Sequence, residues 1–194
     1  MRVNSLFSSP VFETDLDFDL EKLKKQIKEE RKIDNGVKKS NVKGWHSKDI
    51  SNNERFSDFI QKLKEVVQIE FETILNKDRE LELDNCWINI SGKGAYNLSH
   101  VHPMSVISGV LFVDTEPTAR LVFENSQYYA QYYLNSCLTD EFNNQFGFLL
   151  DAPYTPVNGR IVMFPSFLHH SVEQNQKNKE RISISFNFNI VTKS

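Results

Sequence analysis

The stretch from Arg181 to Ile190, RISISFNFNI, alternates strictly between polar and apolar residues. Successive side chains of an extended chain point to opposite faces, so this pattern predicts a β-strand. One face carries Arg, Ser and Asn side chains, and the other carries only Ile and Phe. The polar face either lies in solvent, as in most alternating strands, or lines the interior of a barrel. The residues alone leave both interpretations open.

Upstream of this strand, the sequence from Leu81 onward predicts further short strands separated by turn residues. A Tyr- and Asn-rich stretch, residues 127–155, interrupts the pattern. We interpret it as an insertion, whose secondary structure the sequence leaves undecided. Its tyrosines Tyr128, Tyr129, Tyr132 and Tyr133 either cover a substrate or pack as ordinary core residues. The expected strands are Leu83–Ser91, Ser105–Asp114, Arg120–Glu124, Gly159–Phe164, Ser171–Glu173 and Arg181–Val191.

Before residue 81 the pattern is mainly helical. Apolar residues at helical spacing predict one helix over about Asp19–Lys32 and a second over about Asn53–Asn76. Asp34-Asn35-Gly36 ends the first helix, and a loop follows it. Helices first and strands afterwards predict an α+β fold. The expected organisation is one domain over residues 1–194, with helical support in 1–80 and a sheet-built body in 81–194.

Composition narrows the class of protein. The formal net charge of -3 gives no global electrostatic footprint for nucleic acid. Cys86 and Cys137 lie far apart, so they predict neither a disulfide framework nor a zinc site. No apolar run approaches the roughly 20 residues of a membrane-spanning helix. With no signal-peptide pattern after Met1, the expected location is the cytoplasm.

Four of the five histidines come in two pairs, His100 with His102 and His169 with His170, and His46 stands alone. In an extended chain, residues i and i+2 point to the same face, so His100 and His102 can present both rings to one metal ion. A third ligand from a distant strand would leave positions open, as a catalytic iron site requires. An H-x-H pair by itself is weak evidence, because two surface histidines occur by chance.

Several separated motifs, taken in order, resemble the Fe(II)/2-oxoglutarate oxygenase superfamily, and more closely a group of its small members. The likeness spans about Ser40 to Asn187 and implies a double-stranded β-helix, the jelly-roll or cupin-like barrel, with the helices packed on one side. The motifs are SNVKGWHS (Ser40–Ser47), WINI (Trp87–Ile90), GAYNLSHVHP (Gly94–Pro103), ISGVLFV (Ile107–Val113), FPSFLHHSV (Phe164–Val172) and ERISISFN (Glu180–Asn187).

The resemblance implies a role for particular residues. His100, His102 and His170 would bind Fe(II), whereas His169 would point away. Arg181 lies 181 − 170 = 11 residues after His170, the usual gap to the arginine that binds the distal carboxylate of 2-oxoglutarate. A guanidinium suits that carboxylate because it donates two parallel hydrogen bonds. The further contacts expected for the co-substrate are Ser183, Tyr96 and Asn89.

One position departs from the superfamily pattern, which carries H-x-D or H-x-E where this chain has His102. Three neutral imidazoles leave the site one charge more positive, which changes its redox potential and its affinity for anions. The implied activity is hydroxylation of an unidentified, polar small molecule or side chain. Two alternatives stay open: a cupin-like three-His dioxygenase that does not use 2-oxoglutarate, and a non-catalytic jelly-roll binding module. A homodimer is expected for a domain of this size.

Overall fold

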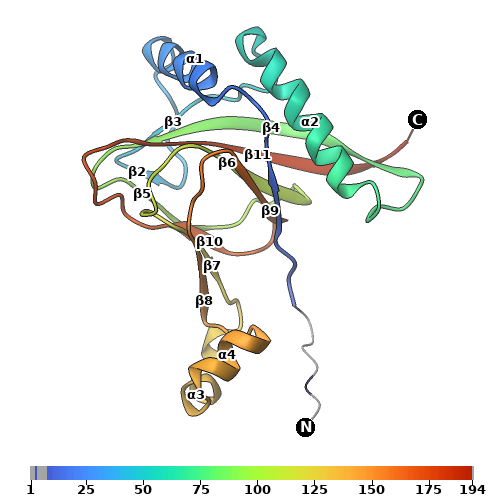
Figure 1. Cartoon of the computed structure of the whole chain (residues 1–194), viewed down its shortest axis with the longest axis vertical. Coiled ribbons are helices and arrows are strands. Elements are labelled where there is room, and N and C mark those ends of the chain that lie inside the picture. The colour runs from blue at the N-terminus through green and yellow to red at the C-terminus, as the bar shows by residue number, and fades with distance from the viewer. Residues whose placement is uncertain (1–2, 4–7, 194) are drawn as a thin grey trace.

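The computed structural model describes Val3 and residues 8–193, apart from the side chains of residues 128–130. Two antiparallel β-sheets face each other, and two helices cover the outer face of the larger sheet (Figure 1). The larger sheet has the strand order β1 (Phe12–Asp15), β9 (Arg160–Pro165), β6 (Ile107–Asp114), β11 (Arg181–Thr192), β4 (Arg79–Ser91) and β3 (Trp45–His46). The smaller sheet has the order β2 (Asn41–Val42), β5 (Tyr96–His100), β10 (His170–Val172), β7 (Leu121–Glu124) and β8 (Asp151–Tyr154).

Strand β11, which contains the alternating stretch, lies inside the larger sheet between β6 and β4. Its apolar side chains, such as Ile184 and Phe186, are fully buried in the cluster beneath the helices. Its polar side chains face the other way and line a cavity between the two sheets. The polar face of the strand therefore lines the interior of the fold, which resolves the question that the sequence left open. The polar residues on the cavity wall are Arg181, Ser183, Ser185 and Asn187.

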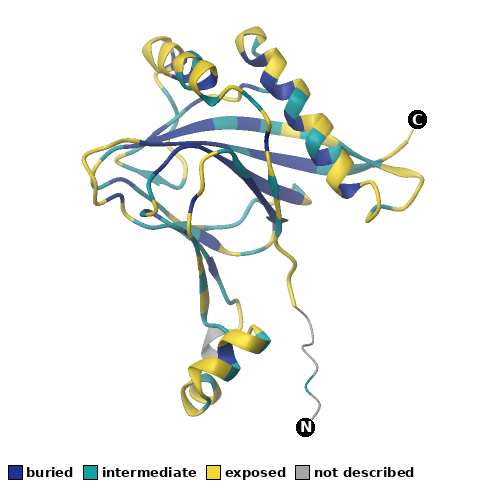
Figure 2. Cartoon of the chain, in the orientation of Figure 1, coloured by how far each residue is buried: buried dark blue, intermediate teal, exposed yellow. Residues whose placement is uncertain are grey.

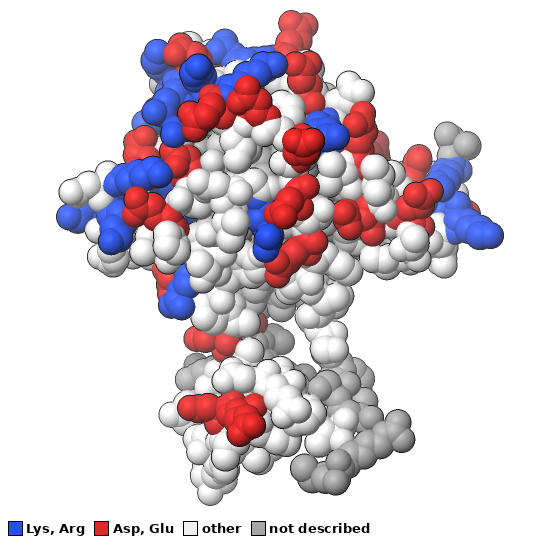
Figure 3. Space-filling view, in the orientation of Figure 1, with Lys and Arg blue, Asp and Glu red and all other residues white. Residues whose placement is uncertain are grey.

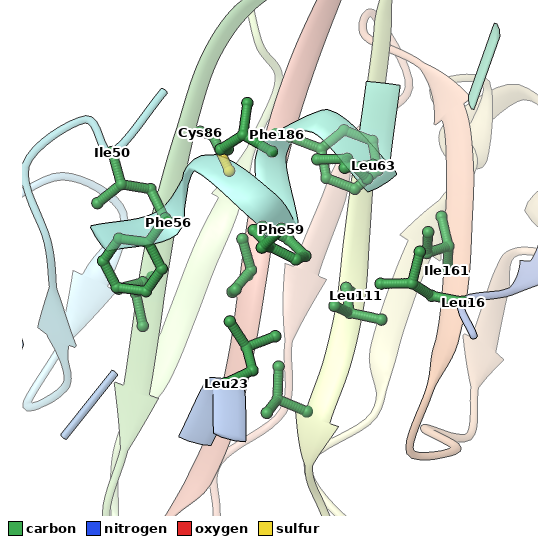
Figure 4. Packing of buried hydrophobic residues seen from close by; sticks show 14 of the residues in the cluster. Leu16, Leu23, Ile50, Phe56, Phe59, Leu63, Cys86, Leu111, Ile161 and Phe186 are labelled. Atoms are coloured by element: carbon green, nitrogen blue, oxygen red, sulfur yellow. The ribbon is translucent and has the colours of Figure 1, made fainter. Parts of the chain in front are cut away.

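The two helices bury their apolar stripes against the outer face of the larger sheet. Helix α1 (Leu20–Ile33) begins at Asp19, whose side chain accepts a hydrogen bond from the backbone N–H of Lys22. In helix α2 (Ser57–Phe71), every fourth residue from Phe59 onward is buried. Figure 2 shows these buried stripes, and Figure 4 shows Leu23, Phe59 and Leu63 in the packed cluster.

The second helix is shorter than the sequence predicts. A 3₁₀ turn, η1 (Glu54–Phe56), precedes α2, and the α-helix ends at Phe71 rather than at Asn76. At this end the α-helical pattern changes to the 3₁₀ pattern, because the N–H of Glu72 donates to the carbonyl of Ile69, three residues back, at 3.2 Å. Ile74, which the pattern places on the apolar face, is consequently 54% exposed.

The first 80 residues also supply strands, which the sequence did not indicate. Strand β1 forms one edge of the larger sheet and β3 the other, while β2 is an edge of the smaller sheet. Strands β2 and β3 have two residues each, too few to show an alternating pattern. The N-terminal segment thus contributes strands to both sheets, in addition to the two helices that cover the larger sheet.

The insertion, residues 127–155, forms a helical hairpin followed by β8. Helix α3 (Tyr128–Cys137) leads into α4 (Asp140–Phe146), which Thr139 caps at its start and Gly147 ends in the left-handed conformation, with φ of 65°. The hairpin projects away from the sheets (Figure 1). Acidic side chains are its only charges in Figure 3, since the sequence has no Lys or Arg between Arg120 and Arg160.

A second, smaller apolar cluster joins the inner faces of the two sheets. It includes Phe112 and Val162 from the larger sheet and Phe123 from the smaller one. This cluster fills one part of the space between the sheets and leaves the rest as the cavity that Arg181 and its neighbours line. None of the described helices combines the length and the apolar character that crossing a bilayer requires.

Candidate metal and co-substrate site

Three histidines converge on one point at the cavity wall. His100 ends β5 and His170 begins β10, and the two residues are direct cross-strand partners. His102 follows two residues after His100, and its ring centroid lies 5.1 Å from that of His100 and 5.0 Å from that of His170. One nitrogen from each ring lies within 4.8 Å of the other two. These are the three histidines that the resemblance implied as metal ligands.

Hydrogen bonds fix the tautomer of all three rings. The Nδ1 atom of His100 lies 2.7 Å from the carbonyl oxygen of Leu98, and that of His170 lies 2.9 Å from the carbonyl oxygen of Leu168. A carbonyl oxygen only accepts hydrogen bonds, so each Nδ1 carries the proton and donates it. The Nδ1 of His102 likewise donates to the amide oxygen of Asn187 at 2.7 Å. Each Nε2 therefore carries the lone pair that can bind a metal ion, and Ser40 Oγ lies 3.4 Å from the Nε2 of His100.

The site keeps these rings neutral. Burial lowers the pKa of His102 to about 4 and that of His170 to about 3, although hydrogen bonds to the rings oppose the shift. Burial also lowers the pKa of His100. At neutral pH the three rings are unprotonated, which is the state that binds a transition metal.

Arg181 lies in the same cavity, which has a volume of about 960 Å³. Its side chain is 5% exposed, and it forms no ion pair with any described residue. Its Nε atom is buried without a hydrogen-bond partner, and its guanidinium carbon lies 5.6 Å from the centre of the Phe112 ring. Burial lowers the pKa of Arg181 to about 10, so it remains a cation at neutral pH. A buried, unpaired cation of this kind requires an anionic partner.

The other expected co-substrate contacts lie in different places. Ser183 is buried on the cavity wall next to Arg181, and Asn89 is its cross-strand partner on β4. The amide nitrogen of Asn89 donates to Ser185 Oγ at 3.1 Å, and its amide oxygen is buried without a partner. Tyr96 is not among the residues that line the cavity, whereas the adjacent Asn97 is.

Neither His169 nor the insertion lines the cavity among the described side chains. His169 is exposed, although its charge contributes to lowering the pKa of His100 and His170. Among the described side chains, none from residues 127–155 lines the cavity, and Tyr133 is 80% exposed. The side chains of Tyr128 and Tyr129 lie outside the described residues, so their expected role stays a prediction.

Two aromatic residues on the cavity wall, His46 on β3 and Trp87 on β4, had no predicted role in the site. Their rings stack with centroids 5.4 Å apart and an angle of 5° between the planes, and the ring of Trp87 makes a T-shaped contact with that of His102 at 5.5 Å. His46 Nδ1 donates to the carbonyl oxygen of Ser47 at 2.8 Å. Both residues lie in motifs that carry the resemblance, so the signal was present, but only the folded sheet shows that they adjoin the histidines.

Comparison with protein families places the site in context. A family model described as "Putative 2OG-Fe(II) oxygenase" matches residues 85–187, more than half of the chain. The matched range contains all three converging histidines together with Arg181 and Asn187. A comparison with curated protein sequences found no match.

Solved structures with similar folds include oxygenases that were crystallised with 2-oxoglutarate. A prolyl-4-hydroxylase from Pseudomonas putida superposes with a TM-score of 0.61 at 14% identity, over 95% of this chain and 94% of that one. HygX from Streptomyces hygroscopicus, solved with nickel, 2-oxoglutarate and hygromycin B, gives 0.62 at 10% identity, over 93% and 83%. The viral collagen prolyl hydroxylase from Paramecium Bursaria Chlorella virus-1, in complex with 2-oxoglutarate, gives 0.59 at 11% identity, over 92% and 94%. These likenesses confirm the predicted jelly-roll fold.

Proposed function

Because this chain belongs to the 2OG-Fe(II) oxygenase family, we propose that it holds Fe(II) on His100, His102 and His170 and binds 2-oxoglutarate through Arg181. The protein is a non-haem oxygenase that depends on Fe(II) and 2-oxoglutarate. Fe(II) with this co-substrate supplies a dioxygen-dependent oxidation, in which one oxygen atom enters the substrate and the other enters succinate as carbon dioxide is released. The assignment of individual residues, and the class of substrate, are our proposal.

The histidine cluster fits a first-row transition metal. Its three Nε2 atoms are unprotonated at neutral pH; two belong to the paired strands β5 and β10, and the third belongs to His102 just beyond the end of β5. Imidazole nitrogen is a ligand that suits iron, zinc, copper and nickel alike, so the donor set alone does not select Fe(II). Three ligands also leave coordination positions for a co-substrate and for dioxygen.

The observation that carries the co-substrate assignment is the unpaired Arg181. A buried guanidinium with a partnerless Nε is costly unless a bound anion satisfies it. It opens onto the cavity that the three histidines share, and Ser183 lies two residues further along the same wall. A molecule with a carboxylate at each end fits this arrangement, one end at the guanidinium and the other at the metal.

The ligand set is neutral, since His102 stands where the superfamily has a carboxylate. Two positive charges of the metal and one of Arg181 therefore face the dianionic co-substrate with no protein carboxylate among the three ligands. We expect this charge balance to strengthen the binding of anions at the metal.

The substrate would lie against the remaining cavity wall. The stacked pair His46 and Trp87 forms a flat surface next to His102, and Asn85 and Ser185 add polar groups. This lining favours a polar small molecule or side chain. A homodimer and a cytoplasmic location also belong to the proposal. The two thiols, Cys86 and Cys137, are unpaired, which suits a reducing compartment.

The test is an anaerobic titration of the apoprotein with Fe(II) and 2-oxoglutarate, followed by absorption. The chelate of 2-oxoglutarate on protein-bound Fe(II) gives a weak visible charge-transfer band. We expect the band in the wild type and its loss in His170→Ala and Arg181→Ala. His169→Ala is the matched control, because this exposed neighbour of His170 should leave the band unchanged.

The result of this titration distinguishes the proposed function from its two alternatives. Metal bound without a band, and without dependence on Arg181, would contradict the co-substrate assignment and favour a three-His dioxygenase that binds its substrate directly. Succinate release measured in parallel distinguishes these two enzymes. An apoprotein that binds no metal at all would reject the histidine assignment.

A further inference from the structure

A chain of hydrogen bonds leads away from the metal site behind His102. The Nδ1 of His102 donates to the amide oxygen of Asn187 at 2.7 Å. The amide nitrogen of Asn187 donates to the amide oxygen of Asn85 at 2.8 Å, and the amide nitrogen of Asn85 donates to a carboxylate oxygen of Asp84 at 2.8 Å. Every donor in this chain points the same way, from the imidazole toward the carboxylate.

Two serines hold the first link in place. Ser108 Oγ donates to the amide oxygen of Asn187 at 2.7 Å and lies 2.8 Å from His102 Nδ1. Ser166 Oγ lies 2.7 Å from Ser108 Oγ. Asn187 is 5% exposed and Ser108 is fully buried, so water competes little for these bonds. The amide of Asn187 can satisfy this arrangement only with its oxygen toward the imidazole.

The other two histidines have a simpler environment. Their Nδ1 atoms bind backbone carbonyls of Leu98 and Leu168, within their own strands and turns. Among the three Nδ1 atoms, only that of His102, which occupies the position of the absent carboxylate ligand, binds a side chain from a distant part of the sequence, the amide of Asn187. This difference indicates that the side chain of Asn187 has a specific role at His102.

We propose that Asn187 is the positioning residue for the metal ligand His102, and that it connects this ligand to the charge of Asp84. Asn187 fixes the tautomer and the plane of the ring, so that the Nε2 lone pair faces the metal. Aligned hydrogen bonds polarise one another, so the chain draws the Nδ1 proton toward Asp84 and makes His102 a better electron donor. The neutral amide does this without placing a negative charge beside the metal. The inference rests on the proposed function, because it assumes that His102 is a ligand.

If Asn187 has this role, one substitution should change the affinity for the metal and the affinity for 2-oxoglutarate in opposite directions. Asn187→Asp keeps an oxygen acceptor for His102, adds a negative charge behind it and loses the N–H that donates to Asn85. The carboxylate should tighten metal binding and weaken binding of the dianionic 2-oxoglutarate. Asn187→Ala removes the acceptor and should weaken metal binding about 10- to 100-fold, the usual effect of removing a hydrogen-bond partner of a metal-binding histidine.

The experiment measures two affinities on the full chain. Co(II) affinity is obtained by competition with a chromophoric chelator, and the Co(II) absorption bands report the ligand field. The 2-oxoglutarate affinity of the Co(II)-loaded protein is then measured by calorimetry. Asn189→Ala is the control, because Asn189 follows on the same face of β11 but does not line the cavity. Circular dichroism checks that each variant is folded.

Metal binding at least as tight as in the wild type, with weaker 2-oxoglutarate binding, is the expected result for Asn187→Asp. General structural damage would weaken both and would overturn the proposal, as would an Asn187→Ala variant with unchanged Co(II) affinity. If the wild type itself fails to bind Co(II), the proposed function fails, and that outcome is distinct from failure of the Asn187 role alone.

Discussion

His100 and His170 lie directly opposite each other on the antiparallel strands β5 and β10, with ring centroids 4.3 Å apart. They are 70 positions apart in the sequence, so only the pairing of these two strands brings them together. The register shifts immediately after His170, between it and Val172. The metal site thus lies at an irregular end of the strand pair, where side chains are free to turn toward a common point.

Metal binding should stabilise the folded chain, because the three-nitrogen site exists only in the native state. At a free metal concentration of one hundred times the dissociation constant, the gain is about 2.7 kcal/mol. We expect Co(II) to raise the melting temperature of the wild type and of His169→Ala, but not that of His170→Ala. An equal rise in all three proteins would mean that the ion binds elsewhere.

The stability of the apoprotein should fall as the pH is lowered below about 6.5. His102 and His170 have folded-state pKa values of about 4 and about 3, whereas an unfolded histidine titrates near about 6.5. Between these values the unfolded chain binds more protons, so acid favours unfolding, by at most about 1.4 kcal/mol per pH unit for each histidine. Above about pH 7 neither state is protonated, and this contribution to stability is fully present. Urea unfolding at several pH values measures the slope.

Carboxylates also contribute to acid unfolding, so a variant that lacks one histidine is required to identify the part of the pH dependence that the histidines cause. His170→Asn removes one of the titrating groups and keeps a polar side chain of similar shape. Its unfolding free energy should depend less steeply on pH between about 6.5 and 4 than that of the wild type. Identical slopes would show that His170 is not protected from protonation in the folded state.

Replacing Arg181 with an apolar residue should separate stability from binding. Arg181→Met removes a buried charge that has no partner among the described residues, so the apoprotein should be as stable as the wild type or more so, by up to about 1–4 kcal/mol. The same variant should bind 2-oxoglutarate at least about 100-fold more weakly, since losing one partner of a buried ion pair costs about 3–5 kcal/mol. Chemical denaturation and calorimetry measure the two effects.

Arg120→Met is the control for this substitution. Arg120 pairs with Glu173 and is 41% exposed, and it does not line the cavity. Its replacement should leave 2-oxoglutarate binding unchanged. A marked loss of apoprotein stability in Arg181→Met would instead assign Arg181 a structural role.

The helical hairpin should be dispensable for metal and co-substrate binding. Glu124 on β7 and Asp151 on β8 are direct cross-strand partners, so a short turn can join the two strands. Replacing residues 126–149 with Asn-Gly, which favours a tight β-turn, should leave both affinities within about twofold of the wild type. Loss of either affinity would show that the hairpin shapes the cavity despite projecting away from it.

The sequence predicted the parts of this fold whose pattern is local. The alternation from Arg181 to Ile190 and the helical spacing in α1 each place a buried face correctly, because burial imposes the period on the residues themselves. The two-residue strands β2 and β3 carry no such period. Tyr96 and Asn97 illustrate a related difficulty: a resemblance identifies a motif, but it does not say which of two adjacent side chains reaches the cavity.

In the candidate site, the sequence indicated those residues whose type and spacing are distinctive. Histidines in an H-x-H pair and a distant Arg after a third His have a recognisable spacing, whereas an amide such as Asn187 has no distinctive chemistry in sequence. Its contact with His102 spans 85 positions and depends on the pairing of β11 with β6, which places Asn187 opposite Ser108. The same applies to the stack of His46 on Trp87, which requires β3 to pair with β4.

The three fixed histidine tautomers should lower the stability of the apoprotein. Each ring directs a lone pair toward the same small region, and the backbone carbonyls and Asn187 prevent the rings from turning their protons inward. The three ring nitrogens lie within 4.8 Å of one another, with the Ser40 hydroxyl near that of His100, so we expect a bound cation to stabilise this arrangement of negative poles. Proteases degrade the unfolded population, so we expect the lifetime of this protein in a cell to follow the supply of iron. Iron starvation would then lower the amount of the enzyme as well as its activity.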